Sequence, residues 1–129
     1  MPDRVDDPNI GDNELLLRRV SPKQINPALG SQGPPPLPSL AFTSNAVPIS
    51  VDRKSLTTLK KVVANYPEHS VLEVSARAVR EAECIVVSDP LPDNPAHALI
   101  LGNGPDNHLK KKEAKAIAQK SNWALYKMP

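Results

Sequence analysis

Aromatic residues and cysteine are scarce in this sequence. Its 129 residues include one cysteine, Cys84, and four aromatic side chains, at Phe42, Tyr66, Trp123 and Tyr126. A core with so few aromatics must rely on Leu, Ile, Val and Ala, which bury less area per residue. Small secreted domains with thin cores usually add disulfides, and a single cysteine cannot form one internally. We therefore expect a reducing compartment.

Long hydrophobic runs are also missing. No apolar run approaches the roughly 18 residues that are needed to span a bilayer. Residues 1–14 are acidic, whereas a secretion signal would be basic and then apolar. The sequence predicts a cytoplasmic protein that has no membrane partner.

Familiar catalytic and metal-binding patterns are absent too. The sequence contains no Gly-x-Ser-x-Gly, no His-Glu-x-x-His and no paired cysteines. Cys84 begins an apolar run, where burial raises the pKa of a thiol and lowers its reactivity. We therefore assign no catalytic residue, no metal and no cofactor.

Proline is abundant and unevenly distributed. Seven of the 15 prolines lie in residues 21–48, which removes amide donors too often for a helix or a central strand. Residues 1–13 hold too little apolar surface to offset the entropy of ordering them. We expect a flexible acidic arm over 1–13 and a single domain over 14–129, which contains the Pro-rich loop 21–48.

Hydrophobic periodicity predicts the secondary structure of the domain. Strands are expected at residues 14–20, 40–42 (a brief edge strand), 49–52, 84–87, 98–101 and 123–126. Helices are expected at 55–66, with Ser55 as its cap, at 70–83 and at 109–121. This order predicts an α+β fold, with a mixed sheet of about five to six strands and about three helices. The runs at 84–87 and 98–101 should be neighbours in the sheet and display the segment between them at its rim.

That connecting segment, residues 88–97, is the first candidate site. Its candidate binding residues are Asp89, Asp93, Asn94 and His97. Two carboxylates and an imidazole spaced by four residues can bind a divalent cation or move a proton if the loop folds back on itself. Asp and Asn before proline are also ordinary turn residues, which favours a plain contact loop.

The charge is segregated between the two ends of the chain. The net charge is +2, but residues 1–14 carry five acids and one arginine, and residues 108–129 carry six lysines and one glutamate. Lys110, Lys111 and Lys112 follow a turn at 102–108 and are candidate phosphate-binding residues. The alternatives are weak nucleic-acid binding by the lysine-rich helix and a solvated helix face that the acidic arm partly neutralises.

Four blocks of the sequence resemble a group of small bacterial proteins without an assigned activity. The blocks are LLLRRV at 15–20, PSLAF at 38–42, SVD at 50–52 and DPLPDNPAHALI at 89–100. This resemblance implies a compact, stand-alone bacterial domain and no particular reaction.

A more distant resemblance is to the first half of ADP-ribosyltransferase folds. In those folds an arginine on the first strand and a serine on a following strand hold NAD, and a later glutamate is the catalytic acid. By this resemblance Arg18 or Arg19 and Ser39 would hold NAD. The sequence departs from the pattern because prolines interrupt the serine segment and no glutamate lies on a late predicted strand.

Three functional hypotheses follow from these observations. The first is a non-catalytic binding or accessory protein of a bacterial system, in defence or toxin control, that contacts a protein partner through loops 21–48 and 88–97. The second is a small nucleotide- or NAD-binding enzyme, with a degenerate ADP-ribosyltransferase-like site, built on Arg19, Asp89, Asp93, His97 and the lysine-rich helix. The third is weak nucleic-acid binding through the C-terminal lysine-rich helix.

Overall fold

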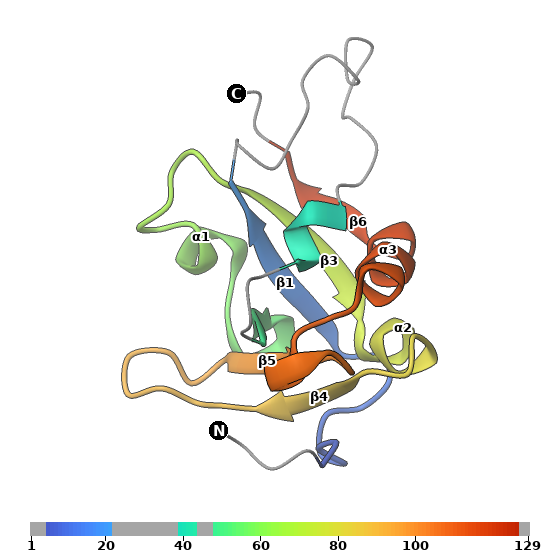
Figure 1. The fold of residues 1–129 in the computed structure, drawn as a ribbon. Helices are drawn as coiled ribbons and strands as arrows, with labels where there is room; N and C mark the ends of the chain where they lie inside the picture. The colour runs from blue at the N-terminus through green and yellow to red at the C-terminus, as the bar shows by residue number, and fades with distance from the viewer. Residues whose placement is uncertain (1–4, 22–38, 44–47, 127–129) are drawn as a thin grey trace, which may run out of the picture.

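The computed structural model describes residues 5–21, 39–43 and 48–126. Six strands form one sheet in the order β4-β5-β2-β1-β3-β6 (Figure 1). They are β1 (Leu15–Val20), β2 (Ile49–Arg53), β3 (Ser70–Ser75), β4 (Ile85–Ser88), β5 (His97–Leu101) and β6 (Asn122–Leu125). The predicted α+β class is confirmed. The predicted mixed sheet is wrong, because every pairing between these strands is antiparallel.

Among the described residues, three α-helices and three short 3-10 helices accompany the sheet. The α-helices are α1 (Leu59–Val62), α2 (Ala76–Glu81) and α3 (Lys111–Gln119), and the 3-10 helices are η3 (Ser39–Phe42), η4 (Lys54–Leu56) and η5 (Pro105–Asn107). No helix in the described part of the chain is long and apolar enough to cross a bilayer.

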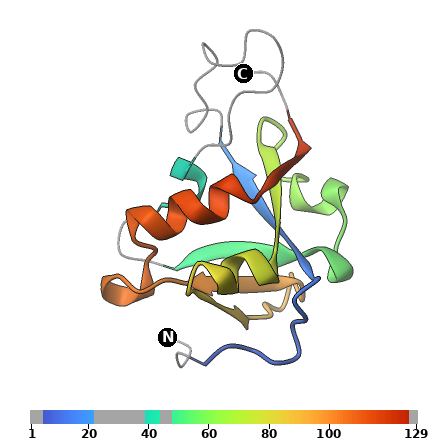
Figure 2. The ribbon, with the colours of Figure 1, turned by 90° about the vertical axis from the view of Figure 1, so that its right-hand side faces the viewer.

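The two faces of the sheet are covered unequally. Helices α2 and α3 lie on one face and the short α1 lies on the other (Figures 1 and 2). Alternation along β1 sends Leu16 and Val20 into the main core beneath α2 and α3, and Leu17 into a small cluster with Val62 of α1. Because α1 is so short, it covers only part of its face.

Three predicted elements are wrong. Residues 40–42 lie in η3 and not in an edge strand, and the helix expected at 55–66 is η4 followed by α1, which Thr58 caps instead of Ser55. The helix expected at 70–83 is strand β3 followed by α2. Residues 70–75 are rich in strand-forming Val and Leu, and antiparallel pairing with all of β1 outweighs their helix-like spacing. Ser75, whose side chain accepts from the Ala78 amide at 3.1 Å, starts α2 at the end of the strand.

The described part of the acidic arm is bound to the domain, although the sequence predicted a loose arm. The Asp7 amide donates to the Val86 carbonyl, and the Val86 amide donates to Asp6 Oδ1, both at 2.9 Å. Ile10 is buried in the main core. The arm thus covers the outer edge of β4, which would otherwise present unpaired backbone groups.

Arg80 of α2 holds this arm in place. Its guanidinium donates to Asp6 at 3.0 Å, to Asp12 at 2.7 Å, and to the carbonyls of Asp7 and Ile10 at 3.2 and 2.7 Å. The acidic arm therefore pairs with Arg80, and among its described residues no acid forms an ion pair with a lysine of the C-terminal helix.

We predict that Arg80→Ala lowers the free energy of unfolding by ~2 kcal/mol, because it removes charge-assisted bonds around a side chain that is largely shielded from water. Urea denaturation measures the loss. Arg77→Ala is the matched control, because Arg77 is 62% exposed and lies 4.0 Å from Asp12, so its loss should stay below ~0.5 kcal/mol. Equal losses in the two variants would contradict a clasping role for Arg80.

Candidate binding groove

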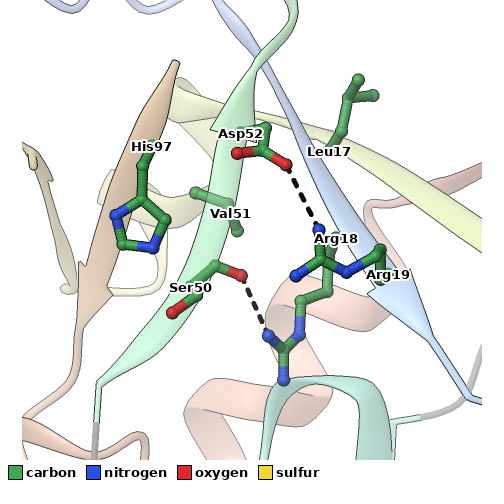
Figure 3. A pocket seen from close by; sticks show the side chains of 7 residues that line it. All are labelled: Leu17, Arg18, Arg19, Ser50, Val51, Asp52 and His97. Carbon is green, nitrogen blue, oxygen red and sulfur yellow. Dashed lines mark hydrogen bonds and ion pairs between the residues drawn. The ribbon is translucent and has the colours of Figure 1, made fainter. Parts of the chain in front are cut away.

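A groove lies on the sheet face opposite α2 and α3. Its floor is formed by Arg19 on β1, Ser50 and Asp52 on β2, and His97 on β5 (Figure 3). One wall is the chain from η4 through α1 to Tyr66, and the other is the hairpin tip between β4 and β5. Its volume of about 560 Å³ lies within the usual size range of ligand sites.

The hairpin wall is the segment that the sequence singled out, and its predicted place is confirmed. Strands β4 and β5 are neighbours, and residues 88–97 extend their pairing as a hairpin. Near the tip, Leu91 and Asn94 each donate to the other's carbonyl at 3.0 Å. Antiparallel pairing with β2 places His97 opposite Asp52, so the base of the hairpin joins the groove floor.

Asp52 is the buried charge of the floor. Its residue is 6% exposed, and its Oδ1 accepts a 2.7 Å hydrogen bond from Asn94 Nδ2. The Oδ1 of Asn94 accepts in turn from the Ala96 amide at 3.2 Å, which fixes the orientation of the Asn94 side chain. The second carboxylate oxygen of Asp52 lies 3.7 Å from Arg19 Nη1. Asn94 therefore joins the hairpin to the sheet, and its side chain provides a hydrogen bond to a carboxylate that is almost completely buried.

His97 is oriented by Asp89. Its Nδ1 lies 3.0 Å from the Asp89 carbonyl oxygen and 3.0 Å from Asp89 Oδ2. Both partners are acceptors, so Nδ1 carries the hydrogen and donates it. The other ring nitrogen, Nε2, faces the side of the floor where Ser50 lies (Figure 3).

The two arginines of β1 have opposite environments. Arg18 points to the face that η3 covers, where its guanidinium donates to the carbonyls of Ala41 at 2.7 Å and Ser50 at 2.9 Å. Burial, aided by the nearby Arg19 charge, lowers the pKa of Arg18 to about 10. Arg19 points into the groove, with its Cζ 4.1 Å from the ring centroid of Tyr66. Arg18 is thus a packing residue, and Arg19 is the arginine that a ligand can reach.

The structure brings together only part of the predicted site. Asp89 contacts His97, and Asn94 contacts Asp52, while Asp93 lines the hairpin wall of the groove. In the described ranges, no three His, Cys, Asp or Glu side chains converge as metal ligands. Ser50, Asp52 and Tyr66 were missed as site residues. The alternation of Ser50 and Asp52 with Ile49 and Val51 was a signal that both face the same way.

The predicted phosphate-binding residues lie elsewhere, around the start of α3. Lys110, Lys111 and Lys112 are exposed. The helix N-terminus is already occupied by Glu113, whose Oε1 accepts from the amides of Lys110 at 2.8 Å and Asn103 at 3.1 Å. Its Oε2 accepts from Asn103 Nδ2 at 2.6 Å. A carboxylate of the chain itself therefore already bonds the Lys110 and Asn103 amides at this turn, and phosphate binding by the three lysines stays a prediction.

Comparisons of the chain with family models, with curated proteins and with solved structures return no match. Both sequence resemblances therefore stay hypotheses. The second resemblance pairs Arg18 or Arg19 with Ser39. Of these two arginines, Arg18 lies beside η3 and donates to its Ala41 carbonyl, whereas Arg19 faces the groove on the other side of the sheet. The function has to be argued from the groove.

We predict that Asn94→Ala lowers the free energy of unfolding by ~2 kcal/mol, because the buried Asp52 carboxylate loses a hydrogen bond. Asn94→Asp should lower the free energy of unfolding further, because it places a second carboxylate against the buried carboxylate of Asp52. Adding Asp52→Asn to Asn94→Asp should recover most of that loss by exchanging the two groups. Urea denaturation of the unsubstituted protein, Asn94→Asp, Asp52→Asn and the variant with both changes forms the double-mutant cycle, and additive losses would contradict the contact.

Glu113 provides a pH-dependent prediction. Burial alone would raise its pKa, but the hydrogen bonds from Asn103 and the Lys110 amide outweigh burial and hold the pKa below the ordinary 4.5. A lowered folded-state pKa stabilises the protein above the unfolded-state pKa, and this stabilisation is lost as the pH falls through the folded-state value. Glu113→Gln should therefore be less stable by ~1–2 kcal/mol at pH 7, and the difference should shrink below about pH 4.5. Urea midpoints from pH 7 to 3 measure it, and a pH-independent difference would contradict this account.

Proposed function

We propose that the protein is a non-catalytic binding protein whose groove receives an extended segment of a protein partner. One observation carries this proposal. Among the described residues, four large hydrophobic side chains are exposed, and three of them, Leu56, Tyr66 and Leu91, line this groove. The fourth, Val5, lies in the N-terminal arm. Apolar side chains gathered in this way around a polar floor are typical of interaction sites.

The rim and the floor suit different parts of a peptide. Leu56 and Tyr66 stand on one wall and Leu91 on the other, at 47%, 41% and 41% exposure, so apolar side chains of a ligand can pack on either side. Between them, Ser50 Oγ and His97 Nε2 have no hydrogen-bond partner in the described part of the chain. An extended backbone needs such partners where it is not paired with a strand.

The arrangement of the polar groups favours binding over nucleophilic catalysis. An activated serine needs a hydrogen bond to its base. No such bond joins Ser50 and His97, although both lie on the floor and Asp89 already orients the imidazole. In this proposal the hairpin is a contact surface, as the sequence predicted. Most of the second predicted contact loop, 21–48, lies outside the described residues.

The exposed rim can be tested by substitution. Leu56→Ser and Leu91→Ser should each weaken binding about tenfold, because each removes apolar area that a bound segment would cover. Val5→Ser is the matched control, since Val5 is the exposed hydrophobic residue away from the groove. The measurement is fluorescence polarisation with peptides that are selected from a random library on the unsubstituted protein.

Loss of affinity in the two groove variants, with Val5→Ser unchanged, is the expected result. If the peptides bind the unsubstituted protein and the three variants with equal affinity, the proposal is contradicted. If ADP or NAD raises the melting temperature, and Leu91→Ser makes that increase smaller, the result would instead favour the nucleotide-binding alternative.

A further inference from the structure

We infer that the groove recognises a carboxylate of the bound segment, and that Arg19 is the residue that holds it. This inference rests on the proposed function and adds the chemistry by which the ligand is selected. It is drawn from the unused donors of Arg19, from its fixed position and from the distribution of charge along the groove.

Most of the donors on Arg19 are unused. Only Nη1 has partners among the described residues: the Val62 carbonyl at 3.4 Å, and Asp52 Oδ2 at 3.7 Å, which is too long for a hydrogen bond. The Nε and Nη2 donors have none, and the side chain is 32% exposed. In Figure 3 the free end of the guanidinium points from β1 toward β2, into the space between the two strands. A carboxylate there can accept two parallel hydrogen bonds from one edge of the guanidinium.

Arg19 is held in position before any ligand arrives. The Tyr66 ring lies 4.1 Å from its Cζ, a favourable cation–π distance. His69 packs against the edge of Tyr66, with 5.1 Å between the ring centroids. Little side-chain freedom is then left for a ligand to remove, which lowers the entropic cost of binding.

The surroundings of Arg19 suit an anion. Lys61, on α1, lines the same wall as Tyr66, and the Ser50 hydroxyl can donate from the floor. Asp52 does not take up an Arg19 donor, because its Oδ2 lies 3.7 Å from Arg19 Nη1, beyond hydrogen-bond distance. The cations therefore lie on the α1 side of the groove, and the exposed acid, Asp93, lies on the hairpin side.

This distribution gives a phosphate no advantage over a carboxylate. Asp52 and Asp93 line the same groove as Arg19 and Lys61, so besides His97 the lining carries two acids and two bases. A doubly charged phosphate would be attracted by the bases and repelled by the acids about twice as strongly as a singly charged carboxylate at the same place, and the two effects oppose each other. The ligand group that fits is an acidic side chain, or the C-terminus, of a peptide.

The test uses three peptides with apolar flanks: acetyl-Leu-Glu-Leu-amide, acetyl-Leu-Gln-Leu-amide, and acetyl-Leu-Gln-Leu with a free carboxyl terminus. Each is titrated into the ¹⁵N-labelled full chain and followed by NMR. The Glu peptide should bind about tenfold more tightly than the Gln amide, with shifts at β1, β2 and β5. Comparison of the Glu peptide with the free-terminus peptide tells whether a side chain or a chain end is preferred.

Arg19→Gln should remove the preference for the Glu peptide, and Arg77→Gln, on an exposed arginine of α2, should leave it intact. Lys61→Gln, on the exposed surface of α1, should reduce the preference without the risk of unfolding the sheet. Groove binding with equal affinity for the Glu and Gln peptides would overturn the carboxylate inference and leave the proposed function standing. If none of the three peptides shifts the resonances of groove residues, both the carboxylate inference and the proposed function are overturned. If ADP shifts these resonances instead, the groove is assigned to a phosphate ligand.

Discussion

The carboxylate of Asp52 constrains the groove more than any other group. It lies on a strand in the middle of the sheet, where water barely reaches it, and a buried charge must be hydrogen-bonded. Asn94 meets that need from the tip of the β4–β5 hairpin, so the hairpin is held against the sheet and forms a wall. The same carboxylate lies near Arg19, which it attracts toward the floor without taking up its donors. One buried charge therefore sets the positions of a wall and a cation.

Strand alternation explains why adjacent arginines have separate roles. Arg18 faces the side that η3 covers and gives its donors to main-chain carbonyls, so it is fixed by packing. Arg19, one residue later, faces the side that α1 covers only in part. A shift of one residue in the pairing of β1 would exchange them and would place Leu16 and Val20 on the open face. The hydrophobic pattern of β1 thus determines which arginine reaches the groove.

Much of the fold could be predicted from local patterns, and the failures have physical causes. The apolar runs at 84–87 and 98–101 were read correctly because they are strand formers bounded by turn residues. Residues 70–75 were misread because Val and Leu at helical spacing also suit a strand, and only the pairing with β1 decides between them. In the site, Asn94 and His97 could be found because they lie in one polar loop. Ser50, Asp52 and Tyr66 could not, because tertiary pairing brings them there from two other segments.

The short length of α1 is what leaves a site on this face. The helix ends at Val62, and the chain then turns, with the Tyr66 amide donating to the Val63 carbonyl at 2.9 Å. This turn places the Tyr66 ring over Arg19 and leaves the guanidinium partly exposed. Complete burial without a full partner is costly for an arginine, because its guanidinium stays charged. A single turn of helix therefore covers Leu17 and Val71, and leaves Arg19 packed on one side and accessible to a ligand on the other.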